Sequence, residues 1–352
     1  MRINSINYFL CNNYNNSTLK NKPENNNIIK FSGSSTGVEG SKMRKALYGI
    51  TCPCCGIKMI STKDINSALK LPPDTPSKEV IPILAKYKNQ LHGVEKDVFY
   101  TLKALSMDYP NLSLRQLLDM EREYSLKLLR NDENKIIERI RKIGHFISEK
   151  SMKKLEATIK EAEQFINQDG INSTFKRRVF IAKIADITKT LPEKDAAQTI
   201  FEIAHEIPRA GNSKPAFIVK YTEKKPSTGI ERTSHDIIKG MLFPSIGTIE
   251  HVKIRSPKFR HGGGKNQRNN YILECQRDNN LRDSMPFIEF IKTNPQFYGE
   301  NLQKYIDTII EKLNNGKLKG FEDYPAQIAR TLRYQSKGKI KIDISKLKIN
   351  NN

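Results

Sequence analysis

The chain of 352 residues contains no tryptophan and is short of acidic residues, with 38 Asp and Glu against 60 Lys and Arg. It lacks any run of about 20 apolar residues, the length that crosses a bilayer, so we expect no membrane-spanning helix. A secretory pattern is also missing, because the apolar stretch at residues 8–11 is too short and is followed at once by Asn residues. These absences predict a cytoplasmic protein.

The scarcity of acidic residues leaves a formal net charge of +22. So large a surplus needs a counter-charge, which nucleic-acid phosphate or an anionic membrane surface usually supplies. The alternative is that the charge only keeps the protein soluble. We expect nucleic acid, and no membrane, as the partner.

The cysteines are few and unevenly placed, with three of the five at positions 52, 54 and 55. Without a secretory signal, such a cluster is more typical of metal binding than of a disulfide framework. Cys52 and Cys55 have the spacing at which two thiolates share one tetrahedral zinc ion. Cys54 is then the spare thiol of the cluster.

Hydrophobic patterning divides the chain into a disordered start, a helical region and a mixed C-terminal part. Residues 1–41 have too few apolar positions to offset chain entropy. Apolar residues at helical spacing follow Ser77 and again Ser113, and later form either one long helix or a hairpin broken near Asn131–Asp132 or Gly144. Residues 217–221 could form a strand, a short helix is expected near 235–241, and two more at about 299–315 and 323–334. Residues 340–349 look like a strand-like surface tail.

The expected fold class is therefore α+β and mainly α-helical, with a small ββα module packed with a helical bundle. The boundaries that we predict are 1–41 for the disordered start, 42–62 for a first zinc knuckle, 63–207 for a helical insertion, 208–245 for a loop-rich connection, 246–285 for the ββα module, and 286–352 for C-terminal helices and a basic tail.

The ββα module is indicated by a change of pattern after Pro244. Residues 248–252 alternate like a strand, and the glycines at 262–264 suit a loop that needs positive φ. Residues 270–275 predict the second strand, and 276–283 can form one or two helical turns.

The ordered set of polar residues in this module resembles the HNH (ββα-metal) nuclease family. That family has an acid–His pair, two glycines, an Asn, a Cys, a second Asn and then a basic residue. The matching positions here are Glu250–His251, Gly263–Gly264, Asn270, Cys275, Asn279 and Arg282. Its members often carry an upstream Cys-x-x-Cys knuckle, to which Cys52 and Cys55 are similar. The 194 residues from 56 to 249 would then be an insertion.

The resemblance implies a hydrolase that cleaves phosphodiester bonds in nucleic acid, with DNA expected first. In it His251 would be the general base, Asn270 would orient the strands around it or polarise its imidazole, and Arg282 would bind phosphate. One Mg²⁺ or Mn²⁺ would be held by Glu250, Asn279 and Asp283. A structural Zn²⁺ would be held by Cys52, Cys55, Cys275 and Asp278, the last at a position where the family commonly has Cys. Nucleic acid would meet Lys253, Arg255, Arg260, Lys265 and Arg268.

Two other functions stay open on the sequence. A zinc-bearing nucleic-acid-binding protein without catalysis would keep the knuckle and the basic surface but would tolerate loss of His251. An interaction scaffold would use the helical bundle to dock a partner and keep the ββα piece as a relic. Each motif residue also has a simpler interpretation: Asn270 and Asn279 could cap turns, and Cys275 could be a small buried hydrophobe.

Overall fold

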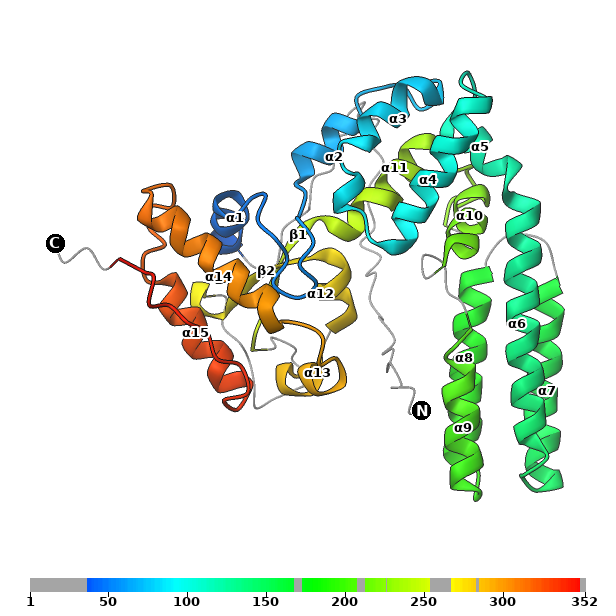
Figure 1. Cartoon of the computed structure of the whole chain (residues 1–352). Coiled ribbons are helices and arrows are strands. Elements are labelled where there is room, and N and C mark those ends of the chain that lie inside the picture. Colours follow the sequence, from blue (N-terminus) through cyan, green and yellow to red (C-terminus); the bar gives the residue numbers. More distant parts are fainter. Residues whose placement is uncertain are drawn as a thin grey trace. The chain divides into compact units, whose positions relative to one another are not determined.

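The computed structural model describes residues 37–167, 173–207, 213–225, 227–253, 267–282 and 285–348. They form two compact units, each assembled from more than one stretch of the chain. The sheet unit contains the described residues up to Lys70, Tyr87–His92 and those from Leu242 onward, and the helical unit contains Leu71–Lys86 and Gly93–Met241. The expectation of a mainly helical α+β chain is confirmed (Figure 1). In these ranges no helix is long and apolar enough to cross a membrane.

The sheet unit is a two-stranded antiparallel sheet surrounded by helices. β1 and β2 pair so that Gly247 lies opposite Cys275 and His251 opposite Tyr271. In chain order the elements are α1 (Gly37–Ala46), α2 (Thr62–Ala68), η1 (Lys88–Gln90), η2 (Phe243–Ser245), β1 (Gly247–His251), η3 (Arg268–Asn270), β2 (Tyr271–Cys275), α12 (Gln276–Arg282), α13 (Phe287–Thr293), α14 (Gly299–Asn314) and α15 (Tyr324–Gln335).

β2 is buried along its whole length, and two tyrosines satisfy the edge that faces away from β1. The Leu273 amide donates to the Tyr305 hydroxyl at 3.2 Å, and the Tyr324 hydroxyl donates to the Tyr271 carbonyl at 3.0 Å. Buried backbone groups without partners are costly, so these hydroxyls take the place of a third strand. The helices α14 and α15 thereby fix the strand that ends in Cys275.

The helical unit contains α3 (Ser77–Ala85), α4 (Gly93–Asp108), α5 (Leu114–Met120), α6 (Arg122–Gly144), α7 (Glu149–Asn167), α8 (Ser173–Thr190), α9 (Lys194–Ala204), α10 (Lys214–Thr222) and α11 (Ser234–Leu242). One apolar core joins α6 to α9, and these helices lie side by side (Figure 1). α6 runs without interruption through Asn131 and Asp132 and ends at Gly144, after which α7 packs back against it. The expected hairpin is therefore confirmed with its break at Gly144, and the break near Asn131–Asp132 is wrong.

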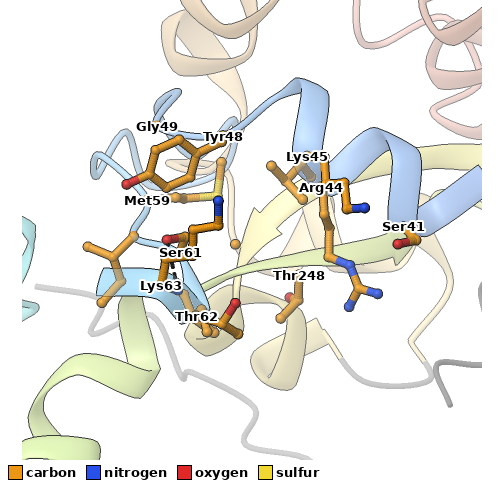
Figure 2. Close-up of a pocket in the computed structure, with 14 residues that line it drawn as sticks. Ser41, Arg44, Lys45, Tyr48, Gly49, Met59, Ser61, Thr62, Lys63 and Thr248 are labelled. Carbon is orange, nitrogen blue, oxygen red and sulfur yellow. Dashed lines mark hydrogen bonds between the residues drawn. The ribbon is translucent and has the colours of Figure 1, made fainter. Parts of the chain in front are cut away.

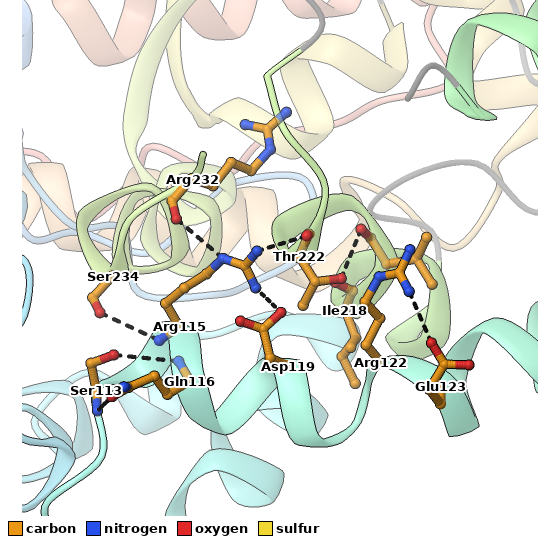
Figure 3. A network of polar contacts seen from close by, with 11 residues as sticks. Ser113, Arg115, Gln116, Asp119, Arg122, Glu123, Ile218, Thr222, Arg232 and Ser234 are labelled. Atoms are coloured by element: carbon orange, nitrogen blue, oxygen red, sulfur yellow. Dashed lines mark hydrogen bonds and ion pairs between the residues drawn. The ribbon is translucent and has the colours of Figure 1, made fainter. Parts of the chain in front are cut away.

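Arg115 connects helices that are far apart in the sequence of the helical unit (Figure 3). Its guanidinium donates to the carbonyls of Thr222 at 2.7 Å and Arg232 at 3.2 Å, and it also pairs with Asp119. Its amide donates to the Ser234 hydroxyl at 3.4 Å. One side chain thus joins α5 to the end of α10 and the start of α11.

Three local predictions were wrong. The apolar run at Phe217–Tyr221 is not a strand but part of α10, because Ser213 caps its start, Pro215 suits its first turn, and a short apolar run fits a buried helix as well as a strand. The stretch 208–245, expected to be rich in loops, therefore holds α10 in addition to α11, and α11 confirms the short helix predicted near 235–241. Residues 340–348 alternate in burial but pair with no strand among the described residues, and their apolar side chains pack on the core of the sheet unit.

The boundaries of the insertion also differ from the predicted ones. α2 belongs to the sheet unit, the chain returns there at Tyr87–His92, and the helical unit extends to Met241 rather than ending near 207. At the N-terminus a helix already begins at Gly37, inside the stretch expected to be disordered, because Met43 and Leu47 are fully buried and anchor it. Residues 1–36 lie outside the described residues.

Candidate functional site

The two strands and the short helix predicted from the sequence are present, in that order, as β1, β2 and α12. β1 ends on Glu250 and His251, and α12 follows β2 without a break. Residues 254–266, which include the three glycines, lie outside the described residues, so the loop predicted there stays a prediction. Asp283, Arg255, Arg260 and Lys265 are outside them too, so their predicted roles stay predictions.

Two distant segments of the sequence meet at a cluster of potential metal ligands. Cys52, Cys55, Cys275 and Asp278 each offer one ligand atom, and the four atoms lie within 4.8 Å of one another. The Cys55 and Cys275 sulfurs are 3.8 Å apart, and the Cys52 thiol donates to Asp278 Oδ2 at 3.1 Å. The convergence of these four residues that the family resemblance implied is confirmed, and the cluster could hold a metal ion.

The local backbone explains how the first two ligands come together. The Cys52 amide donates to the Ile57 carbonyl at 2.7 Å, and the Gly56 amide donates back to the Cys52 carbonyl at 2.9 Å. Gly56 has φ of +78°, a conformation that costs glycine little and other residues more. This tight turn points the thiols of Cys52 and Cys55 to one side. Cys54, which is buried, offers no ligand to the cluster.

The protonation of the cluster shows why a cation would suit it. Burial raises the pKa of Asp278 to about 7 and also raises that of Cys52. The pKa of Cys55 is lowered to about 5, because the neighbouring thiols of Cys275 and Cys52 donate hydrogen bonds to its thiolate. Four acidic groups this close cannot all lose their protons without a counter-charge, which one divalent ion supplies.

The acid of the acid–His pair is buried and forms an ion pair with Arg282. Glu250 is 7% exposed, and its Oε1 accepts from Arg282 Nη1 at 2.5 Å. The Arg282 side chain has no exposed surface, and it also donates to the carbonyls of His251 (2.9 Å), Val252 (2.8 Å) and Met285 (3.3 Å). A guanidinium so enclosed presents no surface to phosphate, so the predicted phosphate contact does not fit its surroundings. Arg282 instead fixes the end of β1 on α12.

The second strand carries a buried carboxyl group that sequence reasoning missed. Glu274 is fully buried, the Tyr298 hydroxyl donates to its Oε1, and its Oε2 has no hydrogen-bond partner. Burial, with the nearby carboxylate of Glu250, holds the pKa of Glu274 well above its usual range. The one signal in the sequence was an acid at the centre of an otherwise apolar strand.

His251 and Asn270 lie at the end of β1. The His251 ring is half-buried and packs edge-on against Tyr271, with ring centroids 4.9 Å apart. Asn270 is buried: its Oδ1 accepts from the Lys253 amide at 2.7 Å, and its Nδ2 donates to the Lys253 carbonyl at 3.0 Å. It therefore holds the chain two residues after His251, and its role at the site stays a prediction.

Asn279 reaches from α12 to the middle of β1. Its Nδ2 donates to the Thr248 hydroxyl at 3.0 Å and to the Ile249 carbonyl at 3.2 Å. Because Glu250 follows Ile249 directly, the helix asparagine lies against the strand segment that leads into the acid–His pair. With the amide nitrogen occupied by β1, the carbonyl oxygen is the atom that could serve a metal.

The two described members of the predicted basic set differ in their surroundings. Lys253 is exposed. Arg268 pairs with Glu39 at 2.8 Å, donates to the Gly320 carbonyl and lies over the Phe321 ring, 4.4 Å from its centroid. These contacts engage Arg268 in holding α1 and the α14–α15 loop to the sheet, so the predicted nucleic-acid contact does not fit its surroundings.

Comparisons with protein-family models, with curated proteins and with solved structures found no match to this chain.

Proposed function

We propose that this chain is a metal-dependent endonuclease of the HNH type that hydrolyses phosphodiester bonds in nucleic acid, with DNA as the first substrate to test. The observation that carries the proposal is the contact of Asn279 with Thr248 and Ile249, which brings the helix asparagine to the strand that ends in Glu250 and His251. The formal net charge of +22 suits a polyanionic substrate.

In this proposal His251 is the general base, because an imidazole titrates near neutral pH and can take a proton from water. Glu250 and Asn279 would hold one Mg²⁺ or Mn²⁺, which prefers oxygen ligands and stabilises charge on the scissile phosphate when bound. Arg282 positions Glu250 and, through the His251 carbonyl, the end of β1. Asn270 holds the following turn at Lys253.

We further propose that the ion at the cysteine cluster is Zn²⁺. Three thiolates and one carboxylate form a closed four-ligand set, and sulfur donors favour zinc over magnesium or calcium. The test is the metal content of the purified protein. We expect about one zinc per chain in the wild type and much less in Cys55→Ser. Equal and negligible zinc in both proteins would exclude this assignment and would leave the nuclease proposal standing.

One observation favours a non-catalytic nucleic-acid-binding protein instead. The Glu250 carboxylate is engaged by the fully buried Arg282, as expected of an acid with a purely structural role. Such a protein would bind nucleic acid and would not cleave it. Cleavage therefore separates the two functions.

The decisive experiment is nicking of supercoiled plasmid with Mg²⁺ or Mn²⁺ by the wild type, His251→Ala and His145→Ala. His145 is exposed on the helical unit, so its variant is a matched histidine control. We expect His251→Ala to lose about 10²- to 10⁴-fold in rate, the usual contribution of a general base, and His145→Ala to cut normally. Equal rates in all three proteins would refute the role of His251. Salt-sensitive binding without cleavage by the wild type would favour the alternative function.

A further inference from the structure

α1 presents a polar stripe to a cavity of about 670 Å³ in the sheet unit (Figure 2). Ser41, Arg44, Lys45 and Tyr48 follow one another at helical spacing, so they lie along one side of the helix and its C-terminal turn. The opposite side is anchored in the core through residues such as Met43. The helix therefore holds two cations and two hydroxyl groups in fixed register along one wall of the cavity.

The other walls come from Ser61–Lys63 and from β1. In Figure 2 Thr248 lies between Lys63 on one side and Arg44 on the other. None of the described residues that line the cavity is acidic, and the neighbouring Asp64 is engaged by the Tyr48 hydroxyl at 2.7 Å and the Ser61 amide at 2.8 Å. Three cations and several hydroxyls around such a cavity suit an anion with many oxygens.

The floor of the cavity is apolar, with Met59 and Leu273 among its residues. A single inorganic phosphate fills only a small part of such a volume and gains nothing from an apolar floor. A sugar–phosphate unit uses both features, because its phosphate meets the cations and its sugar carbons cover the floor. The shape and chemistry therefore favour a nucleotide unit of a chain over a free anion.

The cavity and His251 share a strand, because Gly247 and Thr248 of β1 line the cavity and His251 is the last residue of the same strand. Thr248 precedes His251 by three residues, which is roughly 10 Å along an antiparallel strand. A nucleic-acid strand carries one phosphate per 3.4 Å of duplex axis, so the cavity lies a few nucleotides from the histidine.

We infer that this cavity binds a backbone phosphate and its sugar a few nucleotides from the scissile bond. The inference rests on the proposed nuclease function, for which it supplies the substrate-binding site.

The test is binding of a short fluorescein-labelled DNA duplex by anisotropy, without added Mg²⁺ or Mn²⁺, over a series of salt concentrations. The variants are Lys45→Gln with Lys63→Gln, whose side chains are exposed and whose loss leaves the fold intact, and the same pair with Arg44→Gln. Lys319→Gln, also an exposed lysine of the sheet unit but outside the cavity, is the control. Melting curves establish that all variants fold.

We expect the cavity variants to bind several-fold more weakly and to lose about 0.9 from the slope of log K against log salt for each phosphate contact removed, with the control unchanged. Equal slopes in cavity and control variants would overturn the inference. It would also be overturned if inorganic phosphate displaced the duplex at concentrations where chloride of equal ionic strength did not, because the cavity would then serve a small anion.

Plasmid nicking separates this inference from the proposed function. If the wild type nicks plasmid and the cavity variants bind and nick like the control, the cavity proposal is refuted and the nuclease stands. If the cavity variants show the reduced salt slope but the wild type never nicks, the cavity binds nucleic acid and the nuclease proposal is the one that is refuted.

Discussion

Replacing Arg282 by Met tests whether this arginine holds the site together or contacts phosphate. Methionine keeps much of the apolar volume but removes the charge and every donor. Arg282 is fully buried, and Glu250 beside it is 7% exposed, so the substitution leaves a buried carboxylate without its cation. Breaking a buried ion pair in this way costs about 3–5 kcal/mol. Three backbone carbonyls lose a donor as well, which places the expected cost at the upper end of that range.

Hydrogen–deuterium exchange measures this loss of stability separately for each segment of the chain. Peptides covering β1 and α12 should exchange at least 100-fold faster, since about 1.4 kcal/mol corresponds to one order of magnitude. Peptides from α6, in the other unit, serve as the internal reference. Lys292→Met, which removes an exposed charge from α13, is the matched control. Adding Glu250→Gln to Arg282→Met should recover about 1–3 kcal/mol, because the orphaned buried charge is then gone.

Unchanged exchange in Arg282→Met would refute the structural role. If that variant also bound DNA with a reduced salt slope, the guanidinium would be a phosphate ligand, as the sequence motif had suggested.

Three further outcomes follow from the same site. Zinc affinity, measured by chelator competition, should fall as the pH drops from 8 to 6, because the ligands must lose protons to bind zinc and the pKa of Asp278 is raised to about 7. Asp278→Cys should retain zinc and Asp278→Ala should not. A zinc affinity that does not change with pH would contradict this account. Gly56→Ala should lower the melting temperature of the zinc-loaded protein and reduce its free energy of unfolding by about 1 kcal/mol or more, because φ is +78° and the new Cβ would lie 2.6 Å from Asn301 Oδ1. An unchanged melting temperature would mean that the turn adapts to the alanine. Asn270→Ala should slow plasmid nicking by more than it weakens DNA binding, since Asn270 positions the chain after His251, whereas an equal loss of both would assign it to binding.

The features that were predictable from the sequence are those set by local pattern and ligand spacing. Alternation predicted β1 and β2, the spacing of Cys52 and Cys55 predicted a pair of metal ligands, and the family resemblance added Cys275 and Asp278 from more than two hundred residues further along the chain. The role of Arg282 was not predictable, because a basic residue one helical turn after Asn279 looks the same whether it faces solvent or Glu250. Only tertiary burial decides between the two.

The cavity beside β1 was missed for a related reason. Ser41 lies in a stretch whose composition predicted disorder, yet the helix it belongs to is held by two buried residues further along. The polar stripe that includes Arg44 and Lys45 could not be predicted from the sequence, because it depends on the presence of the helix and on its position against the sheet. α10 shows the converse case, since its run of buried apolar residues carries no period that separates helix from strand.

The positions of the cysteines in the sequence also affect when, during synthesis, the cluster can form. Cys55 and Cys275 are separated by 220 positions, so an ion bound there closes a very long loop of chain. A cross-link that closes a loop of that length lowers the conformational entropy of the unfolded chain by an amount worth about 5 kcal/mol. Such an ion would therefore stabilise the fold by linking early and late parts of the polypeptide. During synthesis the first two thiols leave the ribosome long before their partners, and a truncated chain has nothing to close onto. Binding of an ion by this cluster would thus be a late event in biogenesis, and a site that depends on β2 and α12 cannot form on an unfinished chain.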